Sequence, residues 1–469
     1  MNDGSESISV AGRLAAFSNS FSLDAAPGEV VEGAQRVLLD SLGCALGALG
    51  CDAARVLEEM IQDVGGNSEA TVFGSGLRTN VPNALMVNSA LVRYLDYNDV
   101  YVVLTPHGEG AGAHPSDAIA MVLALAERQR TSGRKVLEAI VLAYQLFGGF
   151  AHYELVPLGA QGWTMEGKAP LVTPLIAGKL LGLTEDQMEQ AVGISGTQAP
   201  PLGILDVEGE EYGMAKNIRF GRTAHQGVIA AYLARRGFTG TRRVIEGRFG
   251  WNEVVMKNEF DLESLELDPD EIGYVVSGVW IKDFTAEGTQ LGHLNATYEL
   301  ITKHDIRPDD IERVDIQATT RTVRHCGGPE KRDPRTKEIA DHSVYYTTAA
   351  LIMDRALGPA QYAPEKLVDG AIRAFMDRVS IEADPELDPF IMAGVSTITL
   401  RSGQAFTARV DYPRGHPRNP MTYDDVVQKF MALATPVVGE TQARQIEQAV
   451  RDLPEQPHVG DLIDAMKVG

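Results

Sequence analysis

The sequence has few cysteines and no long apolar run, and both absences restrict the classes of protein to which it can belong. Only three cysteines occur in 469 residues, and they show neither a CxxC pair nor the spacing of metal ligands. A disulfide framework and an iron–sulfur cluster are therefore not expected. No apolar run is long enough for a membrane span, and the first residues, MNDGSESISVAGRLAAF, lack a basic segment followed by an apolar one. We therefore expect a cytoplasmic protein that is neither secreted nor membrane-spanning.

Positive charge is also scarce. The chain has 42 lysines and arginines against 64 acidic residues, a formal net charge of −22. Nucleic acids and anionic membranes bind basic surfaces, so neither is an expected partner. Gly108, Gly110 and Gly112 form no GxGxxG between a strand and a helix, and no GK[ST] loop is present, so a nucleotide cofactor is not expected. An anionic substrate would need a local cationic pocket.

The length exceeds what one hydrophobic core usually supports, which predicts at least two domains. From residue 32 to about 237 the apolar residues recur at helical spacing, and Thr184 with Gln187 forms the pattern of a capping box. Helices are predicted at 34–49, 136–150, 171–181, 186–194 and 223–236. The acidic segment 260–272, which contains Pro269, is interpreted as a crossing between domains.

After the crossing the pattern changes to a mixture of strands and helices, which predicts an α+β domain. β-branched or alternating segments predict strands at 313–320, 379–383, 395–400 and 405–410, the last two joined as a hairpin at Ser402-Gly403. Helices are expected at 295–303 and 343–354. Beyond Pro420, Thr422 with Asp425 opens another helix, and the C-terminus stays helical.

The stretch from residue 91 to 127 gathers titratable side chains beside a strong helix start. They belong to Asp96, Asp99, His107, Glu109 and His114. Pro115 fits the first position of a helix that continues through 119–125, which places His114 beside backbone amides that disfavour an imidazolium. A neutral His114 suits a general base near pH 7. The alternative is a histidine that only neighbours the helix start, with solvated acids around it.

Three further segments carry candidate groups, each with a plain structural alternative. Lys216, Arg219 and Arg222 recur every three residues, so on a helix they share roughly one side and could hold carboxylates, or they form a solvated face. Residues 282–290, KDFTAEGTQ, follow a strand-like GVWI and form either a site loop or a surface connection. Asp341 is a reasonable N-cap, and His342 is either a second acid/base group or a packed residue.

A metal site is not predicted. His107, Glu109 and His114 give an HxE pair with a distant histidine, which matches no zinc spacing.

Taken together, these segments resemble the MmgE/PrpD family, which includes 2-methylcitrate dehydratases, cis-aconitate decarboxylases and iminodisuccinate epimerases. The resemblance covers nearly the whole chain and rests on motifs in the family's order. They are LLDSLGCALGAL, VRYLDYNDVY, HPSDAI, AGKLLGL, the segment around Lys216, ARRGFTG with EGRFGW, KDFTAEGTQ, DPRTKEIADHSVYY and YPRGHPRNPM.

The resemblance implies a mainly α fold with an inserted α+β domain and a substrate cleft between the two in a homodimer. The corresponding division is a helical domain from 1–268, a lid-like α+β domain from 269–412, and the remainder of the helical domain from 413–469. The resemblance also implies chemistry without a cofactor on a small di- or tricarboxylate. Asp96, His114 and Lys216 match active-site positions of the family, and Glu287 matches the acidic residue of its Pro-Ala-Glu motif.

The chain also departs from the family pattern. Gly162-Trp163-Thr164-Met165 replaces a Gly-Trp-Asp-His stretch, so Met165 stands where a histidine is common. Thr289 likewise stands where dehydratases tend to have histidine, and Thr285 replaces the proline of the Pro-Ala-Glu motif.

The leading hypothesis is a lyase that dehydrates a hydroxy-polycarboxylate of the 2-methylcitrate or citrate type. His114 is expected to act as the base with Asp96 as its partner, Lys216 and Lys282 to bind carboxylate, and His342 to protonate the leaving hydroxyl. The predicted catalytic set also contains Glu287, and the predicted binding set contains Arg219, Asp99 and His107. Epimerisation, decarboxylation and carboxylate binding without catalysis remain the alternatives.

Overall fold

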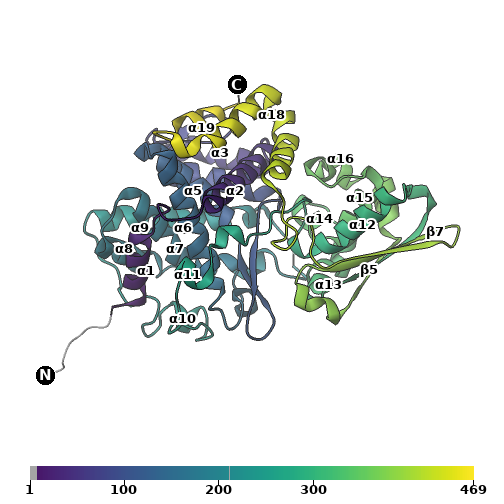
Figure 1. Ribbon diagram of the computed structural model, residues 1–469, viewed down its shortest axis with the longest axis horizontal. Coiled ribbons are helices and arrows are strands. Elements are labelled where there is room, and N and C mark those ends of the chain that lie inside the picture. Colours follow the sequence, from purple (N-terminus) through teal and green to yellow (C-terminus); the bar gives the residue numbers. More distant parts are fainter. Residues whose placement is uncertain (1–7, 211, 469) are drawn as a thin grey trace.

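The computed structural model describes residues 8–210 and 212–468, which fold into a helical lobe and a smaller lobe built around a sheet (Figure 1). The helical lobe contains α1 (Val10–Ser20), α2 (Gly28–Gly47), α3 (Asp52–Val64), α4 (Val81–Tyr94), α5 (Ile119–Gln129), α6 (Gly133–Ala151), α7 (Ala169–Leu181), α8 (Glu185–Ser195), α9 (Arg219–Arg235), α10 (Trp251–Val254), α11 (Pro269–Ile272), α18 (Tyr423–Arg451) and α19 (Gly460–Ala465). The two C-terminal helices return to this lobe, where α18 packs along α2.

The smaller lobe contains a four-stranded mixed sheet in the order β6-β5-β7-β8. Its strands are β5 (Ile311–Ala318), β6 (Val379–Ala383), β7 (Gly394–Leu400) and β8 (Ala405–Val410), and its helices are α12 (Leu291–Lys303), α13 (Thr320–Cys326), α14 (Lys337–Ala340), α15 (Val344–Asp354), α16 (Pro364–Leu367) and α17 (Gly370–Met376). β5 pairs in parallel with β6, whereas β5–β7 and β7–β8 are antiparallel. Gly403, at φ 85°, supplies the left-handed residue of the β7–β8 turn.

Most of the local predictions are confirmed. Thr184 with Gln187 and Thr422 with Asp425 form capping boxes at the starts of α8 and α18. Small residues allow close helix packing: a Cβ on Gly227 of α9 would lie 2.1 Å from Thr173 Oγ1 of α7. The predicted fold class, mainly α with an α+β domain, is confirmed.

Buried apolar side chains form two main cores. One contains apolar residues from 10–281 and 421–466, and the other contains apolar residues from 284–398 together with Val100 and Trp280. The first core therefore extends past the predicted crossing at 260–272, because Val275, Val276 and Ile281 pack into it. The 260–272 segment is acidic, but the change from the first core to the second occurs after it.

Two short strands, β3 (Tyr101–Leu104) and β4 (Gly110–Ala113), form a hairpin that the sequence did not indicate. β4 ends at Ala113, and a 3-10 turn over Pro115–Ala118 then leads into α5, so the helix start predicted at Pro115 is confirmed. His114 lies between this strand and this turn.

Among the described residues, no single helix has the length and apolar composition of a membrane span; α2 and α3, bent 85° apart, meet that test only as a pair.

Candidate active site

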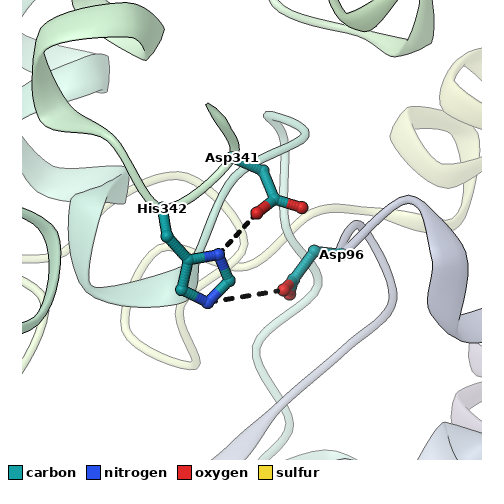
Figure 2. Close-up of side chains that lie close together, drawn as sticks. All are labelled: Asp96, Asp341 and His342. Carbon is teal, nitrogen blue, oxygen red and sulfur yellow. Dashed lines mark hydrogen bonds and ion pairs between the residues drawn. The ribbon is translucent and has the colours of Figure 1, made fainter. Parts of the chain in front are cut away.

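Titratable side chains from both lobes meet at the junction between them. Asp96 follows α4 in the helical lobe, whereas Asp341 and His342 connect α14 to α15 in the sheet lobe (Figure 2). His342 Nε2 lies 4.0 Å from Asp96 Oδ2. Residues far apart in the sequence thus form one cluster.

Asp96 is the centre of this cluster. Lys216 Nζ lies 2.8 Å from Oδ2, Lys282 Nζ lies 2.6 Å from Oδ1, and Arg93 Nη1 lies 3.3 Å from Oδ1. Burial opposes ionisation, but Arg93, Lys216 and Lys282 outweigh it and hold the pKa of Asp96 well below its usual range. Three cations therefore converge on one carboxylate, an excess of positive charge that favours a polyanionic ligand.

The two lysines differ in their hydrogen bonds. Lys282 also donates to the backbone oxygens of Asp96 and Ala286, at 2.8 and 3.0 Å, so its three ammonium protons all have acceptors. Among the described residues, Lys216 donates to Asp96 alone. Lys216 therefore keeps donors for a ligand.

Their acidities differ as well. Burial lowers the pKa of Lys282 despite the neighbouring Asp96. For Lys216, Asp96 and Asp341 outweigh burial and raise the pKa. Lys216 is thus a permanent cation, and Lys282 is the more acidic ammonium.

His114 has a defined tautomer. Its Nδ1 lies 2.7 Å from the carbonyl oxygen of Asp99, and a carbonyl can only accept, so Nδ1 carries the proton and Nε2 has a free lone pair. Burial, together with the charges of Arg93 and Lys282, holds the pKa of His114 well below 6.5. The neutral state was predicted, but burial and cations, not helix amides alone, produce it.

Asp99 supports this arrangement and is not placed to bind substrate, contrary to the prediction. Its carboxylate is fully buried and accepts hydrogen bonds from the Tyr144 hydroxyl (2.6 Å) and the Ser116 amide (3.3 Å). Burial raises its pKa to about 6. Asp99 therefore acts through its backbone carbonyl, which orients His114.

His342 forms a second oriented imidazole. Its Nδ1 is hydrogen-bonded to Asp341 Oδ1 (Figure 2). Lys337 Nζ lies 2.6 Å from Asp341 Oδ2. Lys337 and Lys216 outweigh burial and hold the pKa of Asp341 below its usual range, so Asp341 accepts and Nδ1 donates. Burial and Lys216 lower the pKa of His342 to about 4, which leaves Nε2 unprotonated near pH 7.

One prediction about this segment is wrong: Asp341 is not the N-cap of α15, because Ser343 accepts from the Tyr346 amide instead. The low pKa of His342 favours an acceptor role for Nε2 over the predicted role as proton donor. Asp96, expected as the partner of His114, lies closer to His342 and to the lysines.

The cluster also brings together three groups that could ligate a metal. One ligand atom from each of Asp96, Asp341 and His342 lies within 4.8 Å of the others. Both carboxylates, however, are already contacted by ammonium groups at 2.6 to 2.8 Å, and His342 Nδ1 is held by Asp341. A divalent cation would be repelled by those lysines, so these residues do not fit a metal.

Other predicted residues do not join the cluster. His107 is exposed in the turn between β3 and β4, far along the hairpin from His114. Arg219 is buried between Glu166, 2.9 Å away, and Asp206, so its charge is already balanced. Arg222 is exposed, so the three cations do not share a side.

Glu287 lies at the edge of the cluster. Its amide donates to the Asp341 carbonyl at 2.9 Å, and its carboxylate accepts from the Thr289 amide at 2.9 Å and from the Thr289 hydroxyl. His325 and His342 outweigh burial and lower the pKa of Glu287. Thr289, which stands where dehydratases tend to have histidine, is thus the hydrogen-bond partner of Glu287. Met165, which stands at the other histidine position, is half-buried.

Sequence reasoning missed Arg93, Lys337 and the role of Asp341. Arg93 precedes Asp96 by three residues, and Lys337 precedes Asp341 by four. These are the spacings at which helical residues meet, and that signal was available.

The whole cluster is closed to solvent. Asp96 and Lys216 are each 2% exposed, Lys282 is 1% exposed and His114 is 7% exposed. A substrate can reach these groups only after neighbouring segments move.

Comparison with known proteins agrees with this architecture. The model of the MmgE/PrpD N-terminal domain matches residues 12–263, and that of the MmgE/PrpD C-terminal domain matches residues 284–455. The cis-aconitate decarboxylase of Aspergillus terreus is 24% identical, covering 99% of this chain and 97% of that protein, and the human one is 23% identical, covering 90% and 87%. The 2-methylcitrate dehydratase-like protein oryR of Aspergillus oryzae is 25% identical, covering 72% and 71%.

Proposed function

The chain belongs to the MmgE/PrpD family, and from this premise we propose that it is a lyase that dehydrates a small hydroxy-polycarboxylate. Its relatives carry the names of dehydratases and decarboxylases of small polycarboxylates. The observation that carries the proposal is a buried neutral imidazole, His114, with a free Nε2, whose pKa is lowered by Arg93 and Lys282, two of the three cations that share the Asp96 carboxylate.

The first step is removal of a proton from a carbon next to a carboxylate. His114 Nε2 takes this proton, and the negative charge that develops spreads onto the carboxylate oxygens. Lys216 holds that carboxylate with its remaining donors and stabilises the charge, which is usually the largest contribution to such catalysis.

The second step is loss of the hydroxyl group. The carbon–oxygen bond breaks, the new C=C forms, and the oxygen leaves as water after accepting a proton. Lys282 is assigned as the donor because burial lowers its pKa, and it must exchange one of its three acceptors for the substrate. His342, with an unprotonated Nε2, accepts a hydrogen bond from the same hydroxyl and orients it.

Decarboxylation is the second candidate, since the cis-aconitate decarboxylases match nearly the full length of the chain. That reaction requires a proton to be delivered to carbon after carbon dioxide leaves. Both imidazoles are unprotonated near pH 7 in the free protein, which favours proton removal as the first event.

The test is to incubate the purified protein with 2-methylcitrate and, separately, with citrate, and to follow ultraviolet absorbance from the new C=C. Arg222→Gln, which removes an exposed cation six residues after Lys216, serves as the matched control and should retain full activity. Growth of absorbance supports dehydration. No alkene from either acid, together with turnover of another acid without formation of an alkene by loss of water, would refute it.

A further inference from the structure

A buried ammonium group lies next to the cluster without a partner. Lys331 is 0% exposed, and its Nζ has no hydrogen-bond partner among the described residues. Leaving an ionised group buried and unpaired is costly, so such a group in a native protein needs an explanation.

Tyr212 connects Lys331 to His342, the histidine assigned to orient the substrate hydroxyl. Lys331 Nζ lies 3.9 Å from the centre of the Tyr212 ring, and that ring packs edge-on against His342 with the centroids 5.2 Å apart. The Tyr212 hydroxyl is also buried without a hydrogen-bond partner among the described residues. Two unused donors, one cationic and one neutral, therefore lie on the His342 side of the site.

The backbone fixes this position. The Ser343 hydroxyl donates to the Lys331 carbonyl at 2.6 Å, and Ser343 directly follows His342. Two acids of the cluster are already engaged: Asp341 is held by Lys337 and His342, and Glu287 by Thr289. Burial lowers the pKa of Lys331 although Cys326, Glu330 and Asp341 oppose the shift, and Lys216 adds to it.

We propose that Lys331 and Tyr212 form a second carboxylate subsite, which selects tricarboxylates over dicarboxylates. This inference rests on the proposed function, because it assumes that Lys216 holds the first carboxylate. An incoming carboxylate supplies the partner that the Lys331 ammonium lacks, and the Tyr212 hydroxyl donates to its other oxygen. Lys331 is thus a specificity-determining residue that reaches the site through Tyr212.

The test uses two unreactive probes that differ by a single carboxylate, tricarballylate and glutarate. Calorimetric titration of the full-length protein should show tricarballylate binding at least about tenfold more tightly than glutarate. In Lys331→Met this preference should be lost, with glutarate binding unchanged. Tyr212→Phe keeps the ring and should lose part of the preference, while Arg332→Met, which removes the adjacent exposed cation, should keep it.

Thermal unfolding separates binding from a structural role. If Lys331 is kept for a ligand, Lys331→Met without ligand should melt no lower than the wild type, because an unpaired buried charge has been removed. A lower melting temperature with the tricarballylate preference intact would overturn the inference while leaving the proposed function standing. If the wild type binds neither probe, the proposed function fails and this inference fails with it.

Discussion

The backbone carbonyl of Asp99 fixes the chemistry of His114. The 2.7 Å contact to Nδ1 requires a proton on that nitrogen, so the lone pair is on Nε2. The Asp99 carboxylate, held by Tyr144 and Ser116, immobilises the segment that supplies this carbonyl. Asp99, a buried acid that does not contact the substrate, thus orients His114, the base that does.

His114→Gln should lower kcat for alkene formation by about 10³-fold, because it removes the proton acceptor. The melting temperature should change little. His107→Gln is the matched control, since His107 is exposed in the β3–β4 turn, and its activity should stay within about twofold of the wild type. Equal losses in the two variants would contradict the assignment of His114 as the base.

The imidazoles of His114 and His342 should remain neutral as the pH falls from about 7.5 to about 6. Burial lowers both pKa values, that of His342 to about 4, so protonation needs more acidic solution. Since the neutral forms are active, these groups should cause no loss of kcat/KM over that range. NMR titration of the imidazole protons, assigned with His114→Gln and His342→Gln, measures the pKa values directly. Midpoints near 6.5 would show that the site is not desolvated as described.

Asp341→Asn should lower kcat by about 10²-fold while KM changes less. An asparagine can donate to Nδ1 of His342 and so stabilise the other tautomer, which places the proton on Nε2. Steady-state kinetics at saturating substrate measures the loss. Asp333→Asn, which changes an exposed acid paired with Arg335 and Arg373, is the control and should be silent. If kcat is unchanged in Asp341→Asn, His342 has no role in the mechanism.

Asp96→Asn should destabilise the protein by about 3 kcal/mol, because Arg93, Lys216 and Lys282 would lose their buried counter-charge. Citrate should restore more stability to this variant than it adds to the wild type, since its carboxylates replace the missing one. Urea unfolding with and without citrate gives both values.

Its control is Asp52→Asn, which breaks an exposed pair with Arg55 and should cost less than about 1 kcal/mol. If Asp96→Asn is as stable as the wild type, the excess of positive charge at the cluster is not real.

The sequence was most informative where a local pattern determines the structure. Pro115 marks a helix start because its ring fits that position, and the capping boxes at Thr184 and Thr422 act within one turn. The resemblance to known proteins identified Asp96, His114 and Lys216, which no local pattern would have brought together. These features are therefore predictable from the sequence.

Contacts between residues far apart in the chain could not be predicted from the sequence. Lys282 meets Asp96 across 186 residues, and Lys331 meets Tyr212 through two loops from different lobes. Arg219 shares a sequence spacing with Lys216, yet Glu166 and Asp206 neutralise it, and His107 shares a segment with His114, yet a hairpin carries it into solvent. Spacing along the chain does not reveal which charges already have partners.

The most direct test of the central claim is a proton NMR time course in deuterated water, comparing wild type and His114→Gln with citrate and 2-methylcitrate. We predict that the wild type forms an alkene as the hydroxy acid disappears, seen as a vinyl proton signal from citrate and as the signal of a methyl group on a C=C from 2-methylcitrate, and that His114→Gln forms neither. Exchange of a carbon-bound proton for deuterium without any alkene would indicate epimerisation. Loss of carbon, or equal alkene formation by both proteins, would contradict proton removal by His114 as the step that begins dehydration.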